Sequence, residues 1–288
     1  MKLDSTFKSQ VEEIEQEIKS IKLESNKTKS INHMLSLFQN FIQDNIKEKI
    51  AIAFSGGVDS TFITFLCKTL KKPFHLYSVG LPGSKDLEQA QLLAKEYNLP
   101  LTFKEINSED AEKIIKEVTK LLKTNDPIKI GVGSTFYSVL ELVNKDNHKT
   151  IMTGLGSEEI FAGYQRHKEA LTNNRVNEEC FTGLKTMYLK DLERDNTIAN
   201  HFKIKAIAPF LNKEIVTYAM SLDPKLKINS NQNKILVRLM AESLGIKKEY
   251  CERKKIAAQY GSRFDNHIGK LTKRSGFKYK KDYLQSLI

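Results

Sequence analysis

Residues Ile50 to Ser60 read I-A-I-A-F-S-G-G-V-D-S. The apolar run stops at two glycines and leads into a second apolar segment, Thr61 to Leu66. An apolar run of strand length that is bounded by glycine and followed by an apolar helical segment is typical of the first β-α unit of an α/β domain. We therefore expect a strand, a tight turn and the start of a helix.

The turn residues Ser55, Gly56 and Gly57 are expected to form an anion-binding loop. Unpaired backbone N–H groups beside a helix N-terminus, together with the helix dipole, bind phosphate. The GxxxxGK[ST] loop of γ-phosphate-transferring enzymes is absent, and Asp59 stands here instead of a lysine. A carboxylate beside phosphates implies a divalent cation between them. The alternative is a Gly-rich turn without a ligand.

The segments after this loop alternate between strand and helix patterns. Such alternation predicts an α/β fold with a doubly wound parallel sheet that binds ligands at its C-terminal edge. The expected strands are 74–79, 101–106 and 150–153, and the expected helices are 87–97, about 109–123 and about 135–144.

A second motif, T-G-L-G-S-E-E-I-F-A-G-Y-Q-R-H, runs from Thr153 to His167 at the end of the strand expected at 150–153. Two glycines followed by the carboxylates Glu158 and Glu159 again place backbone donors and a metal-binding acid at the edge of the sheet. We expect this second loop to meet the same ligand as the first.

These motifs carry a family resemblance. Ser55 to Ser60 resembles the S-G-G-x-D-S loop of the N-type ATP pyrophosphatases, which holds the pyrophosphate of ATP while the nucleotide is cut to AMP. The second motif is similar to the S-G-E-G-S-D-E-x-F-x-G-Y loop in the synthetase domain of asparagine synthetases. Four other segments resemble that family as well: Ser78–Leu87, Ala208–Asn212, Arg253–Lys255 and Gln259–Ser262. Altogether the likeness runs from about residue 31 to 264.

The resemblance implies roles for individual residues. ATP and Mg²⁺ are the implied cofactors, with Asp59 and Glu158 as metal ligands, and Lys255, Asp59 and Glu158 are the implied catalytic residues. Lys255 would neutralise charge that develops at the α-phosphate. The implied nucleotide-binding residues are Ser55, Gly56, Gly57, Asp59 and Ser60 for the pyrophosphate, Val79 for adenine through its backbone, and Gly154, Leu155 and Gly156 in the loop over the α-phosphate.

The implied activity is a ligase reaction that adenylates a carboxylate, releases pyrophosphate and then uses ammonia to displace AMP. Aspartate to asparagine is the leading substrate pair. Two departures stand against that pair, because Leu155 replaces the family's glutamate and Gly131 aligns with a family arginine. The resemblance thus supports activation by ATP better than it supports aspartate as the substrate.

The flanks suggest three parts: a helical extension (1–48), the ATP pyrophosphatase-like domain (49–264) and a basic C-terminal tail (265–288). In the extension, two amphipathic helices are expected to pack on the core or to form a homodimer. Lys2 follows Met1, where a glutaminase with an N-terminal nucleophile would need cysteine, so a separate glutaminase could supply ammonia. Lys234 and Arg238, one turn apart after a polar run, are expected to support a helix.

The chain has 288 residues and a formal net charge of +11, with twelve Lys or Arg against four Asp or Glu from Lys247 onward. This basic end is expected to bind RNA weakly at most, and a solvated face is the alternative. No apolar run approaches the length of a membrane span, and a cytoplasmic location is expected. Two rival functions are a tRNA-modifying adenylating enzyme and an ATP-binding regulator that has lost amination chemistry.

Overall fold

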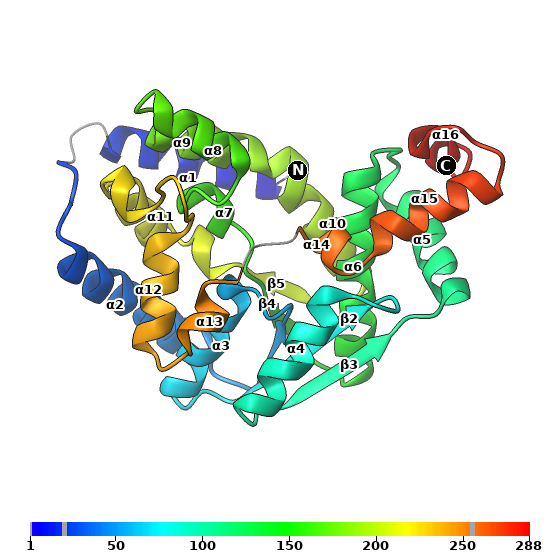
Figure 1. Ribbon diagram of the computed structural model, residues 1–288, viewed down its shortest axis with the longest axis horizontal. Coiled ribbons are helices and arrows are strands. Elements are labelled where there is room, and N and C mark those ends of the chain that lie inside the picture. The colour runs from blue at the N-terminus through cyan, green and yellow to red at the C-terminus, as the bar shows by residue number, and fades with distance from the viewer. Residues whose placement is uncertain (1, 19–21, 254–256) are drawn as a thin grey trace.

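The computed structural model describes residues 2–18, 22–253 and 257–288. Its parallel strands form one sheet in the order β3-β2-β1-β4-β5 (Figure 1). Because the order reverses between β1 and β4, the carboxyl ends of these two neighbours open a crevice suited to a ligand. The strands are β1 Ile50–Ala53, β2 Phe74–Gly80, β3 Leu101–Glu105, β4 Thr150–Met152 and β5 Lys205–Ile207.

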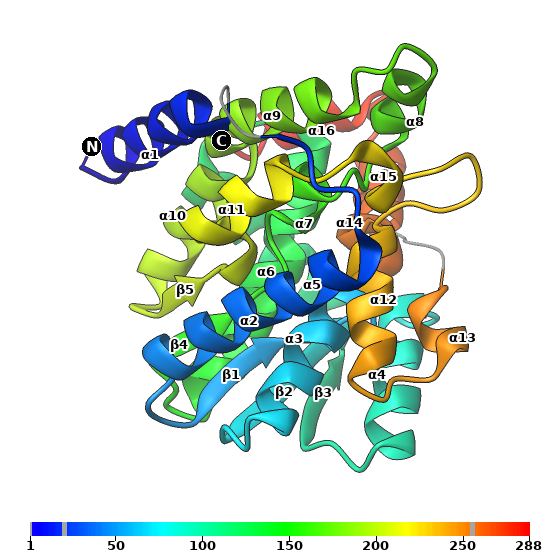
Figure 2. The same ribbon diagram turned by 90° about the vertical axis from the view of Figure 1, so that its left-hand side faces the viewer.

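Helices cover both faces of the sheet (Figure 2). Ile50 and Ile52 of β1 belong to one buried cluster and Ala51 to the other, as expected when successive side chains of a strand point to opposite faces. The doubly wound α/β prediction is confirmed. The first cluster includes residues of α2 Lys27–Asn45, α3 Val58–Thr69, α4 Lys85–Glu96, α9 Val176–Met187, α11 Lys213–Met220 and α12 Ile235–Ser243; the second includes α5 Ser108–Leu122, α6 Pro127–Lys145, α10 Glu193–His201, α15 Phe264–Arg274 and α16 Lys280–Gln285.

Helix α6 begins well before the expected residue 135. Asp126 caps it by accepting a hydrogen bond from the Ile128 N–H at 2.8 Å, and Pro127 fills the first turn. A Cβ built at Gly131 would lie 2.8 Å from the Gln259 Cβ atom, so glycine lets α14 (Ala258–Gly261) pack closely on this helix. The glycine that weakens the helix signal in the sequence is needed for packing.

The N-terminal helices pack on the same body. Helix α1 (Lys2–Ile18) lies against α11 and α9, with Val11 and Ile14 buried and Lys213 Nζ 2.8 Å from Glu13 Oε2. Helix α2 buries Phe38, which meets the Phe62 ring edge-on with 5.0 Å between ring centroids. Packing on the core is therefore confirmed, while a homodimer stays a prediction.

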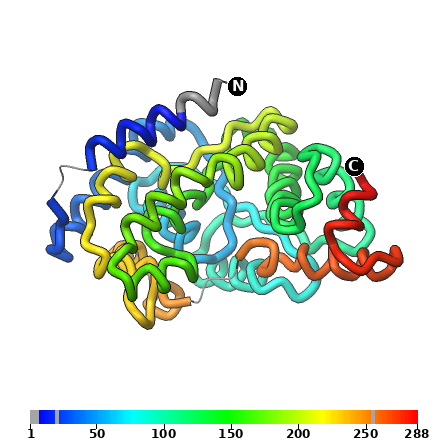
Figure 3. Tube along the Cα trace, turned by 90° about the horizontal axis from the view of Figure 1, so that it is seen from above, coloured from blue at the N-terminus to red at the C-terminus, as the bar shows by residue number. Residues whose placement is uncertain are grey.

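The C-terminal segment is helical and lies at the opposite end of the molecule from α2 (Figure 3). Ile268, Tyr283 and Leu284 are buried, so residues beyond 264 share the core of the sheet domain. In the described part of the chain, no helix combines the length and hydropathy needed to cross a membrane. The remaining elements are short: α7 Ser157–Ile160, α8 Gln165–Thr172, α13 Lys248–Cys251, the π-helix η1 Tyr188–Leu192 and the 3₁₀ turns η2 Pro209–Leu211 and η3 Pro224–Leu226.

Candidate active site

The loop between β1 and α3 folds as a tight turn at the carboxyl end of β1. Gly56 has a φ of +67°, and a Cβ there would lie 2.7 Å from the Gln89 Cγ atom, so both conformation and space require glycine. Gly57 caps α3 without a side-chain hydrogen bond, and its own N–H donates to Ser55 Oγ at 3.3 Å. The first turn of α3 thus keeps backbone donors for an anion.

The loop after β4 approaches the first loop closely. A Cβ at Gly154 would lie 3.0 Å from the Asp59 Cβ atom. Gly156 has a φ of +94°, and a Cβ there would lie 2.4 Å from Leu211 Cδ2. The two motifs predicted to share a ligand therefore meet at Gly154, and the positive φ of Gly156 favours glycine next to this contact.

Asp59 and Glu158, the predicted metal ligands, both contact the ammonium group of Lys234. Ser157 Oγ donates to Asp59 Oδ1 at 2.5 Å, whereas Lys234 Nζ donates to Asp59 Oδ2 at 2.5 Å and also to Glu158 Oε1. Burial disfavours the charged ammonium, but the two carboxylates outweigh it, so the pKa of Lys234 is raised. The sequence pattern led us to expect only helix support from Lys234, because its partners lie 175 and 76 positions away along the chain.

The carboxylate oxygens fit magnesium, which proteins usually hold through one or two carboxylates together with substrate phosphates. In residues 2–18, 22–253 and 257–288, no group of three or more His, Cys, Asp or Glu side chains could hold a metal ion. Phosphate oxygens beside the N-terminus of α3 would complete the ligands of a cation at Asp59 and Glu158.

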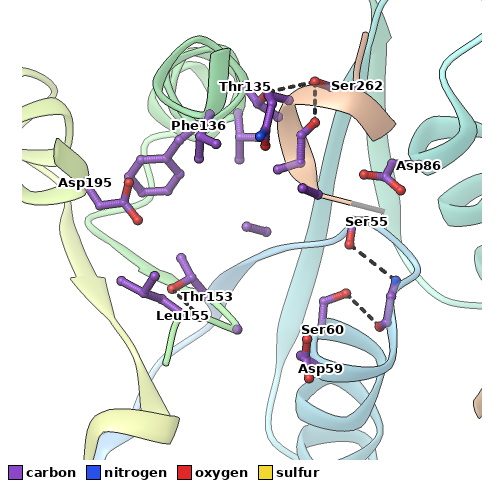
Figure 4. Close-up of a pocket in the computed structure, with 18 of the residues that line it drawn as sticks. Ser55, Asp59, Ser60, Asp86, Thr135, Phe136, Thr153, Leu155, Asp195 and Ser262 are labelled. Carbon is purple, nitrogen blue, oxygen red and sulfur yellow. Dashed lines mark hydrogen bonds between the residues drawn. The ribbon is translucent and has the colours of Figure 1, made fainter. Parts of the chain in front are cut away.

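A cavity of about 380 Å³ joins these features (Figure 4). Its lining includes Ser55 and Ser60 from the first loop, Leu155 from the second loop, and Val79 at the end of β2. Gly57, Asp59, Gly154, Gly156 and Glu158 line it as well, so these predicted site residues share one cavity. The roles assigned to them remain predictions.

The sequence did not single out Asp191, Arg194 and Asp195, which line the far side of the cavity. Arg194 of α10 is buried and donates through Nε to Asp195 Oδ1 at 2.7 Å and through Nη1 to Asp191 Oδ1 at 2.9 Å. Nearby, Tyr164 Oη donates to Glu159 Oε1 at 2.7 Å. Burial raises the pKa of the Glu159 carboxyl. All five side chains line the cavity. Glu159 and Tyr164 belong to the second motif, whereas Asp191, Arg194 and Asp195 carry no signal in the sequence beyond being polar residues on helical segments.

Lys255, the predicted catalytic lysine, lies outside the described residues. The described residues on either side of it reach the site. Arg253 Nη2 donates to Asp86 Oδ1 at 3.1 Å and its Nη1 donates to the Ser55 carbonyl at 3.4 Å. Ala257 lines the cavity.

The two departures from the family pattern differ in character. Leu155 lines the cavity and its side chain cannot transfer a proton. Gly131 is buried where α6 meets Gln259, and an arginine side chain would collide with that contact. The first departure changes the chemistry of the cavity, and the second changes the packing of its wall.

Two solved structures are similar in overall shape at low identity. The first is the U34-tRNA thiolase NcsA from Methanococcus maripaludis, at 16% identity and a TM-score of 0.42, covering 90% of this chain and 78% of that one. The second is the NMN synthetase from Francisella tularensis, at 10% identity and a TM-score of 0.36, covering 89% of this chain and 98% of that one.

Closer relatives appear among curated sequences. The putative asparagine synthetase [glutamine-hydrolyzing] 1 of Methanocaldococcus jannaschii is 33% identical over 270 residues, which are 81% of this chain and 49% of the relative. The human asparagine synthetase [glutamine-hydrolyzing] is 27% identical over 266 residues, covering 88% of this chain and 46% of the relative. The chain thus spans about half the length of these relatives. A family model described as asparagine synthase matches residues 45–179 and 171–276. The chain belongs to the asparagine synthase family.

Proposed function

We propose that the protein is an ATP-dependent, amide-forming synthetase that adenylates a carboxylate and releases pyrophosphate and AMP, with ammonia as the nitrogen donor. The observation that carries the proposal is the meeting of both motif loops in one cavity, where Asp59 and Glu158 lie beside the N-terminus of α3. A phosphate-binding helix end next to two carboxylates suits the polyphosphate of a magnesium nucleotide.

In this proposal the chain's own groups bind and orient the nucleotide. The N–H groups at the start of α3 and the hydroxyls of Ser55 and Ser60 hold the pyrophosphate, and the end of β2 at Val79 receives adenine. Bound magnesium would stabilise negative charge on the phosphates, held by Asp59 and Glu158. Lys255 would stabilise charge at the α-phosphate, a contribution typically worth on the order of 10²–10³ in rate.

The far side of the cavity favours an amino acid as the acid substrate. Asp191 and Asp195 both contact Arg194, and burial raises the pKa of the Asp195 carboxyl. When both are ionised, they carry one more charge than Arg194 cancels, which suits the ammonium group of an amino acid. Aspartate to asparagine therefore remains the leading pair in our proposal. Leu155 weakens it, because a leucine supplies neither charge nor a proton to the second carboxylate or to the amination step.

Exchange of labelled pyrophosphate into ATP tests the proposal most directly. The enzyme should catalyse exchange only when its acid substrate is present, so the screen should include amino acids and simple carboxylates in parallel. Asp59→Asn should abolish exchange by removing a metal ligand while the protein stays folded. Failure of every acid in the screen to support exchange would contradict the proposal.

Leu155 also motivates a second candidate, an ATP-binding regulator without amination chemistry. That protein would bind magnesium ATP in the same cavity and turn nothing over. Calorimetric binding of ATP, combined with no exchange for any acid in the screen, would favour the regulator over the synthetase.

A further inference from the structure

Lys234 occupies an unusual position behind the two acidic residues of the site. Its side chain is only 1% exposed, whereas the side chains of Asp59 and Glu158 keep 19% and 11% exposure. The two carboxylates line the cavity, and Lys234 contacts them from the side of α12. The ammonium group thus lies on the buried side of the pair, and Asp59 keeps the larger exposed fraction of the two acidic side chains.

The surrounding backbone fixes this lysine in place. Lys234 adopts a φ of +53° as the N-cap of α12, and Arg238 holds the preceding residue by donating to the Asn233 carbonyl at 2.7 Å and to Asn233 Oδ1 at 3.0 Å. Asn233 Nδ2 in turn donates to the Gly163 carbonyl at 2.7 Å. A left-handed conformation is unfavourable for lysine, so these contacts hold the residue against local strain.

Space around the ammonium group is also restricted. A Cβ at Gly163 would lie 1.6 Å from Glu158 Oε2 and 2.7 Å from Lys234 Cε. Glycine is therefore required for Glu158 and Lys234 to approach each other. The arrangement involves three separate segments of the chain, which carry Asp59, Glu158 to Gly163, and Lys234.

The charges of Asp59, Glu158 and Lys234 determine how strongly this site attracts a divalent cation. Two carboxylates this close repel each other, and a pair without a counter-ion is a strong site for any divalent cation. One ammonium group reduces the net charge of the pair from −2 to −1. The attraction for a free cation falls accordingly, whereas a cation that arrives with phosphates brings additional oxygen ligands of its own.

We propose that Lys234 is a positioning residue that holds Asp59 and Glu158 as a preformed pair and, by cancelling one of their charges, makes divalent-cation binding depend on the phosphates of the nucleotide. The inference rests on the proposed function, since it takes these two acids as the metal ligands. It adds an order of binding, in which the cation enters together with the nucleotide.

The test is a titration with Mn²⁺ in the absence of nucleotide, followed by electron paramagnetic resonance. The native protein should bind Mn²⁺ weakly, and Lys234→Met should bind it at least about tenfold more tightly, because one positive charge next to the cation is gone. Lys234→Arg keeps the charge and should behave like the native protein. Adding Asp59→Asn to Lys234→Met should remove the gained site.

A second variant and a measurement on the native protein keep the test decisive if Lys234→Met does not fold. Lys234→Gln removes the charge but keeps an N–H donor for a carboxylate, and it should also gain affinity. In the native protein, a non-hydrolysable ATP analogue should tighten Mn²⁺ binding by at least about tenfold. Folded Met and Gln variants without gained affinity, or tight Mn²⁺ binding by the native protein alone, would overturn the proposal.

The outcome can be separated from that of the proposed function. Native protein that exchanges pyrophosphate while the Lys234 variants gain no Mn²⁺ affinity would refute only the role of Lys234. Gained affinity in the variants, with no exchange by the native protein for any acid, would support the role of Lys234 and refute the synthetase.

Discussion

Gly163→Ala is a small change that should disturb the acid pair without removing any of its charged groups. The added Cβ would lie 1.6 Å from Glu158 Oε2, far inside van der Waals contact, so the Glu158 side chain must move. Lys234 Cε, at 2.7 Å, would be pushed as well. Overpacking of this kind typically destabilises a protein by about 1–3 kcal/mol. Displacement of Glu158, a proposed metal ligand, should also lower pyrophosphate exchange by at least about tenfold.

Urea unfolding and the exchange assay together measure these two effects. Gly269→Ala is the matched control, because its Cβ would meet only the flexible end of Lys280, at 3.3 Å from Cε, in the middle of α15. That substitution should stabilise the protein by roughly 0.5–1 kcal/mol through helix propensity and leave exchange unchanged. If Gly163→Ala matched the parent within about twofold in exchange and showed no loss of stability, the geometry argued for the acid pair would be refuted.

Leu155→Glu should leave nucleotide binding nearly unchanged and should not lower ammonia-dependent amide formation; a loss would show that the leucine belongs to the acid pocket, and that the acid is not aspartate. Purified protein should use ammonium but not glutamine, and release of glutamate from glutamine by this chain alone would contradict this. Stability should fall as pH drops below about 6.5, because burial lowers the pKa of His167 to about 3 and the folded state therefore favours the neutral ring. Urea unfolding at about pH 7.5 and pH 5.5 should show a smaller difference for His167→Gln than for the parent.

The sequence predicted the parts of the fold that local patterns determine. The apolar runs of β1 to β4 and the glycines of both loops carry their own signals, and the structure places them as expected. Strand β5 was not expected from the sequence, and Lys205–Ile207 is a strand because it pairs with β4. Long-range pairing of this kind overrides weak local preference.

The candidate site divides in the same way. Asp59 and Glu158 could be singled out because each follows a glycine-containing loop at a strand end. Lys234 and Arg194 could not, because their meaning depends on partners brought together by tertiary packing and on burial, neither of which a local pattern contains. The close contact of Gly131 with Gln259 is likewise invisible until α6 and α14 are placed together.

In the proposed reaction, the chain joins a carboxylate to the α-phosphate of ATP. Turnover of an acid labelled with oxygen-18 in its carboxylate tests this directly, because displacement of AMP from an acyl-adenylate leaves one carboxylate oxygen on the nucleotide. Mass spectrometry should find a single oxygen-18 atom in AMP and none in pyrophosphate, in amounts that match the amide formed. Label in inorganic phosphate, with ADP as the nucleotide product, would rule out the proposed adenylation.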